Sequence, residues 1–193
     1  MRCLIAVPTF ENIQPETFKS IYGLDIPEDF ECDFTFIRGY DCAIARNKVA
    51  KAALEYDYLL SIDSDMMIPE DALRKLYEAG FDICFGVYPR STGDGTNIIK
   101  PSMRDFVDSY FFAELDKLSG PISVKAGGFG CALIKTTVFQ RVPFPWFKYV
   151  AYNDGRTLSE DYYFCKQAGM YDFSLGVEPT VRCGHIIRTF QYE

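Results

Sequence analysis

Residues 58–65 read Tyr-Leu-Leu-Ser-Ile-Asp-Ser-Asp, an apolar run that ends in two acidic residues. Apolar runs of this length are typical of buried strands. In open α/β sheets, ligands bind beyond the carboxyl ends of the strands, and Asp63 and Asp65 lie at such an end. The segment therefore predicts an α/β fold and marks the place in that fold where a ligand binds.

Strand and helix signals alternate around this segment over the first ninety residues. Such alternation is typical of a Rossmann-like, mostly parallel central sheet flanked by helices. The expected strands are 2–7, 32–37, 58–62 and 82–88, and the expected helices are 15–22, 41–55 and 69–80. A chain of 193 residues has the length of one domain, so we expect residues 1–193 to form a single domain.

Individual residues mark the expected helix boundaries. Pro15 and Pro69 suit the first position of a helix, which would make Ile68 the cap of the helix that Pro69 opens. Asp41 has a side chain that can cap the helix after it. In that helix we expect the apolar residues to form one face and Arg46 to point elsewhere.

The second half of the chain has less regular signals. Residues 89–101 are rich in turn-forming residues, which is typical of a loop that closes over a ligand. Further expected elements are strands at 122–126 and 130–134, a helix at 159–168, and short strands up to Arg182.

Composition and charge exclude several classes of function. The chain is 48% hydrophobic, so it can form a packed core. Its formal net charge of −7 provides no basic surface for nucleic acid or anionic membrane, and no segment has the length of a membrane span. An anionic substrate would therefore need a metal ion or a few well-placed basic side chains.

The cysteines argue for a reducing environment. There are seven of them, widely spaced and without a Cys-X-X-Cys pair, which indicates neither a disulfide framework nor a zinc site. A cytoplasmic protein is expected from this pattern. The apolar run at the N-terminus is too short for a signal peptide.

The acids after residue 62 suit a metal site. Asp63 and Asp65 are two residues apart, so in an extended segment they point the same way. Two converging carboxylates repel each other unless a cation lies between them, and oxygen ligands suit Mg²⁺ or Mn²⁺. The alternative is that they cap the following helix, but they precede Pro69 by too many residues for that role.

Three segments together resemble glycosyltransferases of the GT-A fold, of the DxD-containing, family 2-like type. They are residues 6–11 (Ala-Val-Pro-Thr-Phe-Glu), Arg46-Asn47, and residues 58–65. The resemblance covers roughly the first ninety residues and implies that residues 1–88 bind the nucleotide of a UDP- or GDP-sugar, and 89–193 the sugar and acceptor. It assigns the nucleotide and metal to five residues of the first loop and the DxD motif: Pro8, Thr9, Asp63, Ser64 and Asp65.

The resemblance also assigns roles to Arg46 and Gly128. Arg46 stands where family members often place a basic residue against the nucleotide, although a surface ion pair is an equal alternative. Residues 127–132 (Gly-Gly-Phe-Gly-Cys-Ala) are similar to the family's glycine-rich segment, so Gly128 would help to form a wall of the sugar pocket. The alternative is a bulged or tightly turned pair of strands.

A further segment, Ser159-Glu160-Asp161, resembles the acidic motif from which inverting members take their general base. A carboxylate beside the acceptor can remove the proton of the attacking hydroxyl, and we assign this role to Asp161. The sequence leaves open whether Glu160 is the base instead. It also leaves open ordinary helix chemistry, with Ser159 as the cap and acids in the first turn.

The remaining candidates lie late in the chain. His185, the single histidine, follows an expected strand end, where many GT-A enzymes place a further metal ligand. A structural histidine is the alternative. Arg188 could contact a diphosphate or lie on the surface. The aromatic residues of 144–152 could stack on an acceptor sugar or pack in the core.

These observations predict a metal-dependent glycosyltransferase of the hexosyltransferase type, which moves a sugar from a nucleotide-sugar donor to an unidentified acceptor hydroxyl, with inversion favoured over retention. One alternative is a non-catalytic nucleotide- or sugar-binding module of the same fold. The other is a nucleotidyltransferase, which would normally carry a Gly-rich, basic signature after the first strand. Residues 8–12 (Pro-Thr-Phe-Glu-Asn) lack that signature.

Overall fold

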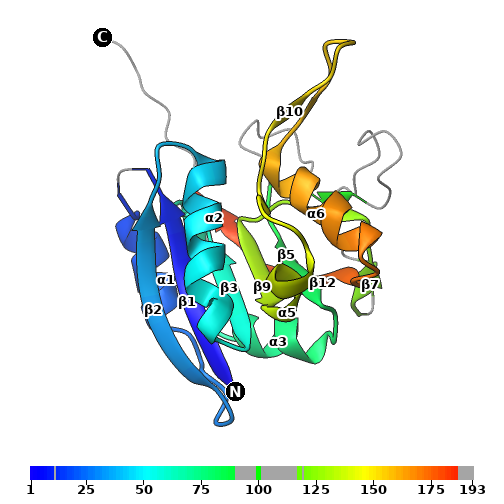
Figure 1. Cartoon of the computed structure of the whole chain (residues 1–193). Coiled ribbons are helices and arrows are strands. Elements are labelled where there is room, and N and C mark those ends of the chain that lie inside the picture. Colours follow the sequence, from blue (N-terminus) through cyan, green and yellow to red (C-terminus); the bar gives the residue numbers. More distant parts are fainter. Residues whose placement is uncertain (11, 90–98, 101–116, 119, 187–193) are drawn as a thin grey trace.

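The protein is an α/β sandwich in which helices cover both faces of a central sheet, as the computed structural model shows (Figure 1). The structure describes residues 1–10, 12–89, 99–100, 117–118 and 120–186. Most of the loop expected at 89–101, together with Arg188, lies outside the described residues.

The central sheet has seven strands in the order β2-β1-β3-β9-β5-β12-β7. Strands β9 and β7 run antiparallel to their neighbours, and the other pairings are parallel, which confirms a mostly parallel sheet. The strands are β1 (Arg2–Thr9), β2 (Glu31–Arg38), β3 (Tyr58–Ile62), β5 (Ile83–Val87), β7 (Ile122–Ser123), β9 (Cys131–Lys135) and β12 (Leu175–Arg182).

The order of the strands differs from a simple doubly wound sheet in one respect. Strand β9, from the second half of the chain, lies between β3 and β5 and pairs with both. Its first residue, Cys131, is opposite Ile62, so the glycine-rich segment before it reaches the carboxyl end of β3. There the backbone N–H of Asp63 donates to the carbonyl of Gly130 at 3.0 Å.

Each face of the sheet has its own apolar core. Helices α1 (Pro15–Tyr22) and α3 (Ala72–Glu78) cover one face, with Leu73 and Leu76 of α3 fully buried. The other face is covered by three helices, α2 (Cys42–Ala52), α5 (Thr137–Arg141) and α6 (Glu160–Met170), and the short 3₁₀ helix η1 (Ala53–Glu55) follows α2. Burial of the apolar side of each helix against the sheet stabilises the sandwich.

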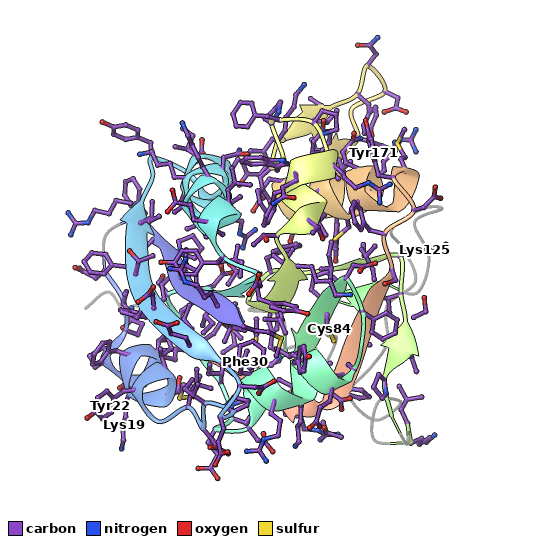
Figure 2. The ribbon with its side chains drawn as sticks, turned by 60° about the horizontal axis from the view of Figure 1, so that its bottom comes forward. Lys19, Tyr22, Phe30, Cys84, Lys125 and Tyr171 are labelled. Atoms are coloured by element: carbon purple, nitrogen blue, oxygen red, sulfur yellow. The ribbon has the colours of Figure 1, made fainter. Side chains whose placement is uncertain are left out.

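Apolar side chains lie mainly in the interior, and charged side chains lie mainly on the surface. Figure 2 shows Phe30 and Cys84 among the interior side chains, whereas Lys19 and Tyr22 of α1 point outward. All seven cysteines are free, and Cys3, Cys84, Cys131, Cys165 and Cys183 are buried. Among the described residues, no helix is both long enough and apolar enough to cross a lipid bilayer.

Two expectations about the helices are wrong. Helix α3 begins at Ala72 with Asp71 as its cap, so Ile68 does not cap it. Pro69 instead starts a turn, in which its carbonyl accepts the N–H of Ala72 at 3.1 Å. Arg46 of α2 does not point away from the core: it is only 6% exposed, because two carboxylates hold it there. The Asp41 cap is confirmed, since its side chain accepts the N–H of Ile44 at 2.7 Å.

Three short two-stranded sheets complete the described structure. The hairpin of β10 (Val150–Ala151) and β11 (Thr157–Leu158) projects from the body of the molecule (Figure 1). Strand β6 (Ile99–Lys100) pairs with β8 (Ala126–Gly127). Strand β4 (Met66–Met67) pairs antiparallel with β13 (Gly184–His185), and this pairing brings the single histidine to the loop that carries the two acids.

Candidate functional site

A cleft of about 410 Å³ opens where β1 and β3 end. The structure brings six of the predicted site residues together in its wall: Pro8, Thr9, Arg46, Asp63, Ser64 and Asp65. These residues come from β1, α2 and the loop after β3, so three segments that are separate in the sequence form one site. Because parallel strands place their carboxyl ends at one edge of a sheet, the fold itself produces this convergence.

The loop that carries the acids is held by backbone hydrogen bonds. The carbonyl of Ser64 accepts the N–H of Gln14 at 2.9 Å and the hydroxyl of Thr17 at 3.2 Å. The carbonyl of Asp63 accepts the N–H of Met66 at 3.2 Å. Since these bonds use the main chain, the loop is fixed without engaging the carboxylate of Asp65.

Arg46 joins two carboxylates inside the protein. Its Nη2 donates to both carboxylate oxygens of Asp63, at 2.9 Å each, and its Nη1 donates to Oε1 of Glu160. The side chains of Arg46 and Glu160 are each 7% exposed, and that of Asp63 is 28% exposed. The guanidinium also lies 5.7 Å from the centre of the Phe129 ring. Arg46 therefore forms a buried ion-pair bridge, not a surface ion pair.

Among the described residues, negative charge exceeds positive charge at this site. Burial raises the pKa of Asp63 and of Glu160, and Arg46 opposes the rise in both. The neighbouring charge of Asp161 raises both pKa values further. One arginine thus faces several acids in a region of low dielectric, where like charges repel strongly. A cation or an additional proton would stabilise the site.

His185 lies against the second acid of the loop. Its Nε2 is 3.3 Å from Oδ2 of Asp65, and its Nδ1 is 3.0 Å from the carbonyl oxygen of Pro89. A carbonyl oxygen only accepts hydrogen bonds, so Nδ1 carries a proton. In a neutral imidazole, Nε2 then presents a lone pair toward a carboxylate, an arrangement that a proton or a metal ion between them would stabilise.

The side chains at this point supply some of the ligands that a divalent ion needs. Asp65 and His185 offer an oxygen and a nitrogen at one point, and the bond from Nδ1 to a backbone carbonyl is the usual support of a metal-binding histidine. Asp63 already shares both oxygens with Arg46. Within the described part of the chain, no group of three or more His, Cys, Asp or Glu side chains is placed to hold a metal. A metal here would need further ligands from substrate or water, as Mg²⁺ commonly has.

Asp161 lies beside the cleft, at the start of α6, and is not part of the cleft lining. Its Oδ1 accepts the N–H of Tyr162 at 2.7 Å and the hydroxyl of Ser159. Its charge also raises the pKa of Asp63 and of Tyr88, which places its carboxylate in the electrostatic environment of the site. Ser159 takes the cap position of the helix with no side-chain cap bond of its own.

The glycine-rich segment lies behind the cleft. Gly128 is buried between β8 and β9 and does not line the cleft. A side-chain carbon at Gly127 would lie 2.6 Å from the Phe85 ring, and one at Gly130 would lie 2.6 Å from the Tyr88 ring. Close packing against these rings explains both glycines.

Aromatic residues of 144–152 lie both in the core and at the cleft. Tyr149 lines the cleft, whereas Trp146 and Phe147 are buried. Tyr88 had no predicted role, yet its hydroxyl accepts the N–H of Gly130 at 2.9 Å, and its ring lies 6.0 Å from that of His185. The signal that could have found Tyr88 is its position directly after a buried strand, the same position that Asp63 occupies after β3.

Comparisons with known proteins support the fold and leave the family open. No protein-family model matches the sequence, and no curated protein matches it. Among solved structures, A197 from STIV is similar over 97% of this chain and 87% of its own, with a TM-score of 0.67 and 20% identity. GalNAc-T7, solved with UDP, GalNAc and Mn²⁺, is similar over 97% of this chain with a TM-score of 0.65 and 13% identity.

A third similar structure is that of residues 1–349 of S. aureus TarS in complex with UDP-GlcNAc, with a TM-score of 0.56, 16% identity and 99% of this chain covered. The chain spans 43% of the GalNAc-T7 chain and 60% of the TarS chain. At these identities the similarity shows the fold alone. The protein has a GT-A-like fold, with a seven-stranded central sheet flanked by helices.

Proposed function

We propose that the protein is a metal-dependent glycosyltransferase that moves a hexosyl group from a nucleoside-diphosphate sugar to an acceptor hydroxyl. The observation that carries the proposal is the pairing of Asp65 with His185 at the rim of a cleft formed by strand ends. An oxygen and a supported imidazole nitrogen at one point are suited to Mn²⁺ or Mg²⁺. When bound, such an ion supplies charge stabilisation to the departing diphosphate.

Several residues in the cleft and at its rim have a defined part in this proposal. Asp65 and His185 would hold the ion, and Asp63 would join them through a lone pair that its bonds to Arg46 leave available. Pro8 and Thr9, at the end of β1, would lie against the nucleotide. Two exposed rings in the same wall, Phe10 and Tyr40, offer stacking surfaces for the base of UDP or GDP.

The choice of general base favours Asp161 over Glu160. Glu160 is buried, pairs with Arg46 and hydrogen-bonds the side chain of Tyr149, so its carboxylate is already engaged by the protein. Asp161 has one carboxylate oxygen engaged by Ser159 and Tyr162, which orients the other for proton abstraction from an acceptor. A carboxylate base of this kind corresponds to inversion at the sugar carbon.

Thermal unfolding with a panel of nucleotides tests the proposal. We expect UDP, GDP or one of their sugars to raise the melting temperature in the presence of Mn²⁺, because a ligand of the native state stabilises it by mass action. Asp65→Ala should abolish the rise. Asp154→Ala, an exposed acid of the β10–β11 hairpin, is the matched control and should leave it intact.

Two results would contradict the proposal. If no nucleotide stabilises the protein with or without Mn²⁺, the cleft is not a donor site. If nucleotides bind but no sugar is released from any donor, the protein is a binding module of the same fold.

A further inference from the structure

We infer that Arg46 and Glu160 are positioning residues that lock the helix carrying Asp161 to the loop carrying the metal-binding acids. The catalytic part of the inference rests on the proposed function. The mechanical part rests on the buried bridge from Glu160 through Arg46 to Asp63. The bridge connects α6, α2 and the loop after β3, so it joins the two halves of the chain at the cleft.

The hydrogen-bonding groups of Arg46 are directed at protein carboxylates. Nη1 and Nη2 each donate to an acid, and Nε is buried without a hydrogen-bond partner among the described atoms. A guanidinium recognises a phosphate best by presenting two parallel N–H groups to it. Here both terminal nitrogens are already engaged by carboxylates and only Nε is unpartnered, so the arrangement of Arg46 is that of a structural link.

Glu160 sets the orientation of the first turn of α6. It is the first residue of the helix, and Asp161 is the second. Successive residues of an α-helix are about 100° apart around the axis, so a helix with one of these side chains fixed presents the other in a fixed direction. With Glu160 held inward by Arg46, the neighbouring side chain of Asp161 is presented beside the cleft.

Loss of the central Arg46 should destabilise the protein more than loss of Glu160 at one end of the bridge. Removing the charge of Arg46 would leave Asp63 and Glu160 as carboxylates without their cation in a largely buried site. Removing the charge of Glu160 leaves the pair of Arg46 and Asp63 intact, weakens the link between Arg46 and α6, and also alters the hydrogen bond between Glu160 and Tyr149. The variant Glu160→Gln, which keeps the size of the side chain, therefore tests the positioning role.

Hydrogen exchange tests the mechanical part in the free protein. We expect the backbone amides of residues 160–164 to exchange at least several-fold faster in Glu160→Gln and in Arg46→Met than in wild type. The control is Glu178→Gln, because Glu178 is an equally buried acid that bonds Thr180 on β12. Unchanged exchange in both bridge variants would overturn the inference, whether or not the protein binds a nucleotide.

Kinetics test the catalytic part. With Mn²⁺ and UDP-GlcNAc, and water as the acceptor, Glu160→Gln should lower kcat about 10- to 100-fold, because small displacements of a catalytic group have effects of this size. Affinity for Mn²⁺ with UDP should stay within about threefold of wild type. Faster exchange with an unchanged kcat would overturn the positioning role. Failure of the wild type to bind Mn²⁺ with UDP or GDP would instead count against the proposed function.

Discussion

At the scale of single residues, the pairing of His185 with Asp65 is the most informative contact. The imidazole Nδ1 is anchored on a backbone carbonyl, so Nε2 is the atom that faces the carboxylate. The same anchoring is usual in metal sites, where it fixes the ring and raises its affinity for the ion. The contact can therefore be tested as a metal site directly, without any substrate.

Because the chain contains one histidine, its ring protons can be identified in an NMR spectrum without ambiguity. We expect substoichiometric Mn²⁺ to broaden these signals strongly, since the ion would lie on the ring nitrogen. His185→Ala should lower the affinity for Mn²⁺ about 10- to 100-fold or more by titration calorimetry, the range seen even for residues one shell further out. Sharp ring signals at saturating Mn²⁺ would rule out His185 as a ligand.

Cys42 reports on the cleft from a second position. It is exposed and lines the cleft. Partial burial of its sulfur and the charges of Glu160 and Asp63 raise the pKa of Cys42, although Arg46 opposes the rise. The thiolate is the reactive form, so iodoacetamide should modify Cys42 more slowly than a model thiol at pH 8. The rate of modification of Cys42 should reach that of the model thiol only at higher pH.

A bound nucleotide should protect Cys42 from the same reagent. Peptide mass spectrometry after brief alkylation, with and without Mn²⁺ and UDP or GDP, measures the protection. If the nucleotide raises the melting temperature and Cys42 is alkylated at an unchanged rate, the nucleotide binds elsewhere than in this cleft.

At the scale of elements, the glycines beside β9 determine how closely the sheet packs behind the site. An added carbon at Gly127 or Gly130 would overlap an aromatic ring. We expect Gly127→Ala and Gly130→Ala to lower the free energy of unfolding by about 1–3 kcal/mol, as overpacked sites do.

The matched control is Gly169→Ala in α6, where an added carbon has no neighbour within 4 Å. That change should be neutral or stabilising by about 0.5–1 kcal/mol, because alanine favours the helix. Urea unfolding measures all three variants. Equal stability of Gly127→Ala and Gly169→Ala would show that the Phe85 ring moves aside at little cost.

The elements also show what sequence patterns can determine. Apolar runs and a capping residue located β1, β3, β5 and α2 correctly, because these signals are local. The insertion of β9 between β3 and β5 depends on contacts between residues far apart in the chain, which no local pattern contains. The start of α3 was misjudged because a proline also suits the turn that precedes a helix.

The candidate site, like the fold, could be predicted where it depends on local sequence and not where it depends on distant contacts. Asp63, Ser64 and Asp65 follow a buried strand, so their position could be inferred from the sequence, and β1 brings Pro8 and Thr9 to the same edge. The burial of Arg46 could not be inferred, because it depends on Glu160, which is 114 residues further along the chain. A charged residue in a helix is normally expected to face solvent.

At the scale of the whole molecule, two acids whose pKa values shift in opposite directions on folding should affect the pH dependence of protein stability in opposite ways. Burial raises the pKa of Glu160 from its ordinary 4.5. For Asp82 burial acts in the same direction, but hydrogen bonds from Ser174 and Lys135 outweigh it and lower the pKa below 3.8. Glu160 therefore binds a proton more readily in the folded state than in the unfolded state, and Asp82 binds one less readily.

The sign of each contribution follows from this difference. The stability of wild type relative to Glu160→Gln should fall as the pH rises above 4.5 toward the folded-state pKa of Glu160. The contribution of Asp82 to stability, measured as the stability of wild type relative to Asp82→Asn, should be complete above pH 3.8. It should decrease as the pH falls below that value. Urea unfolding of the three proteins between about pH 3 and pH 7 measures both trends. Parallel trends for the two variants would mean that Arg46 outweighs burial and lowers the pKa of Glu160 in the folded protein.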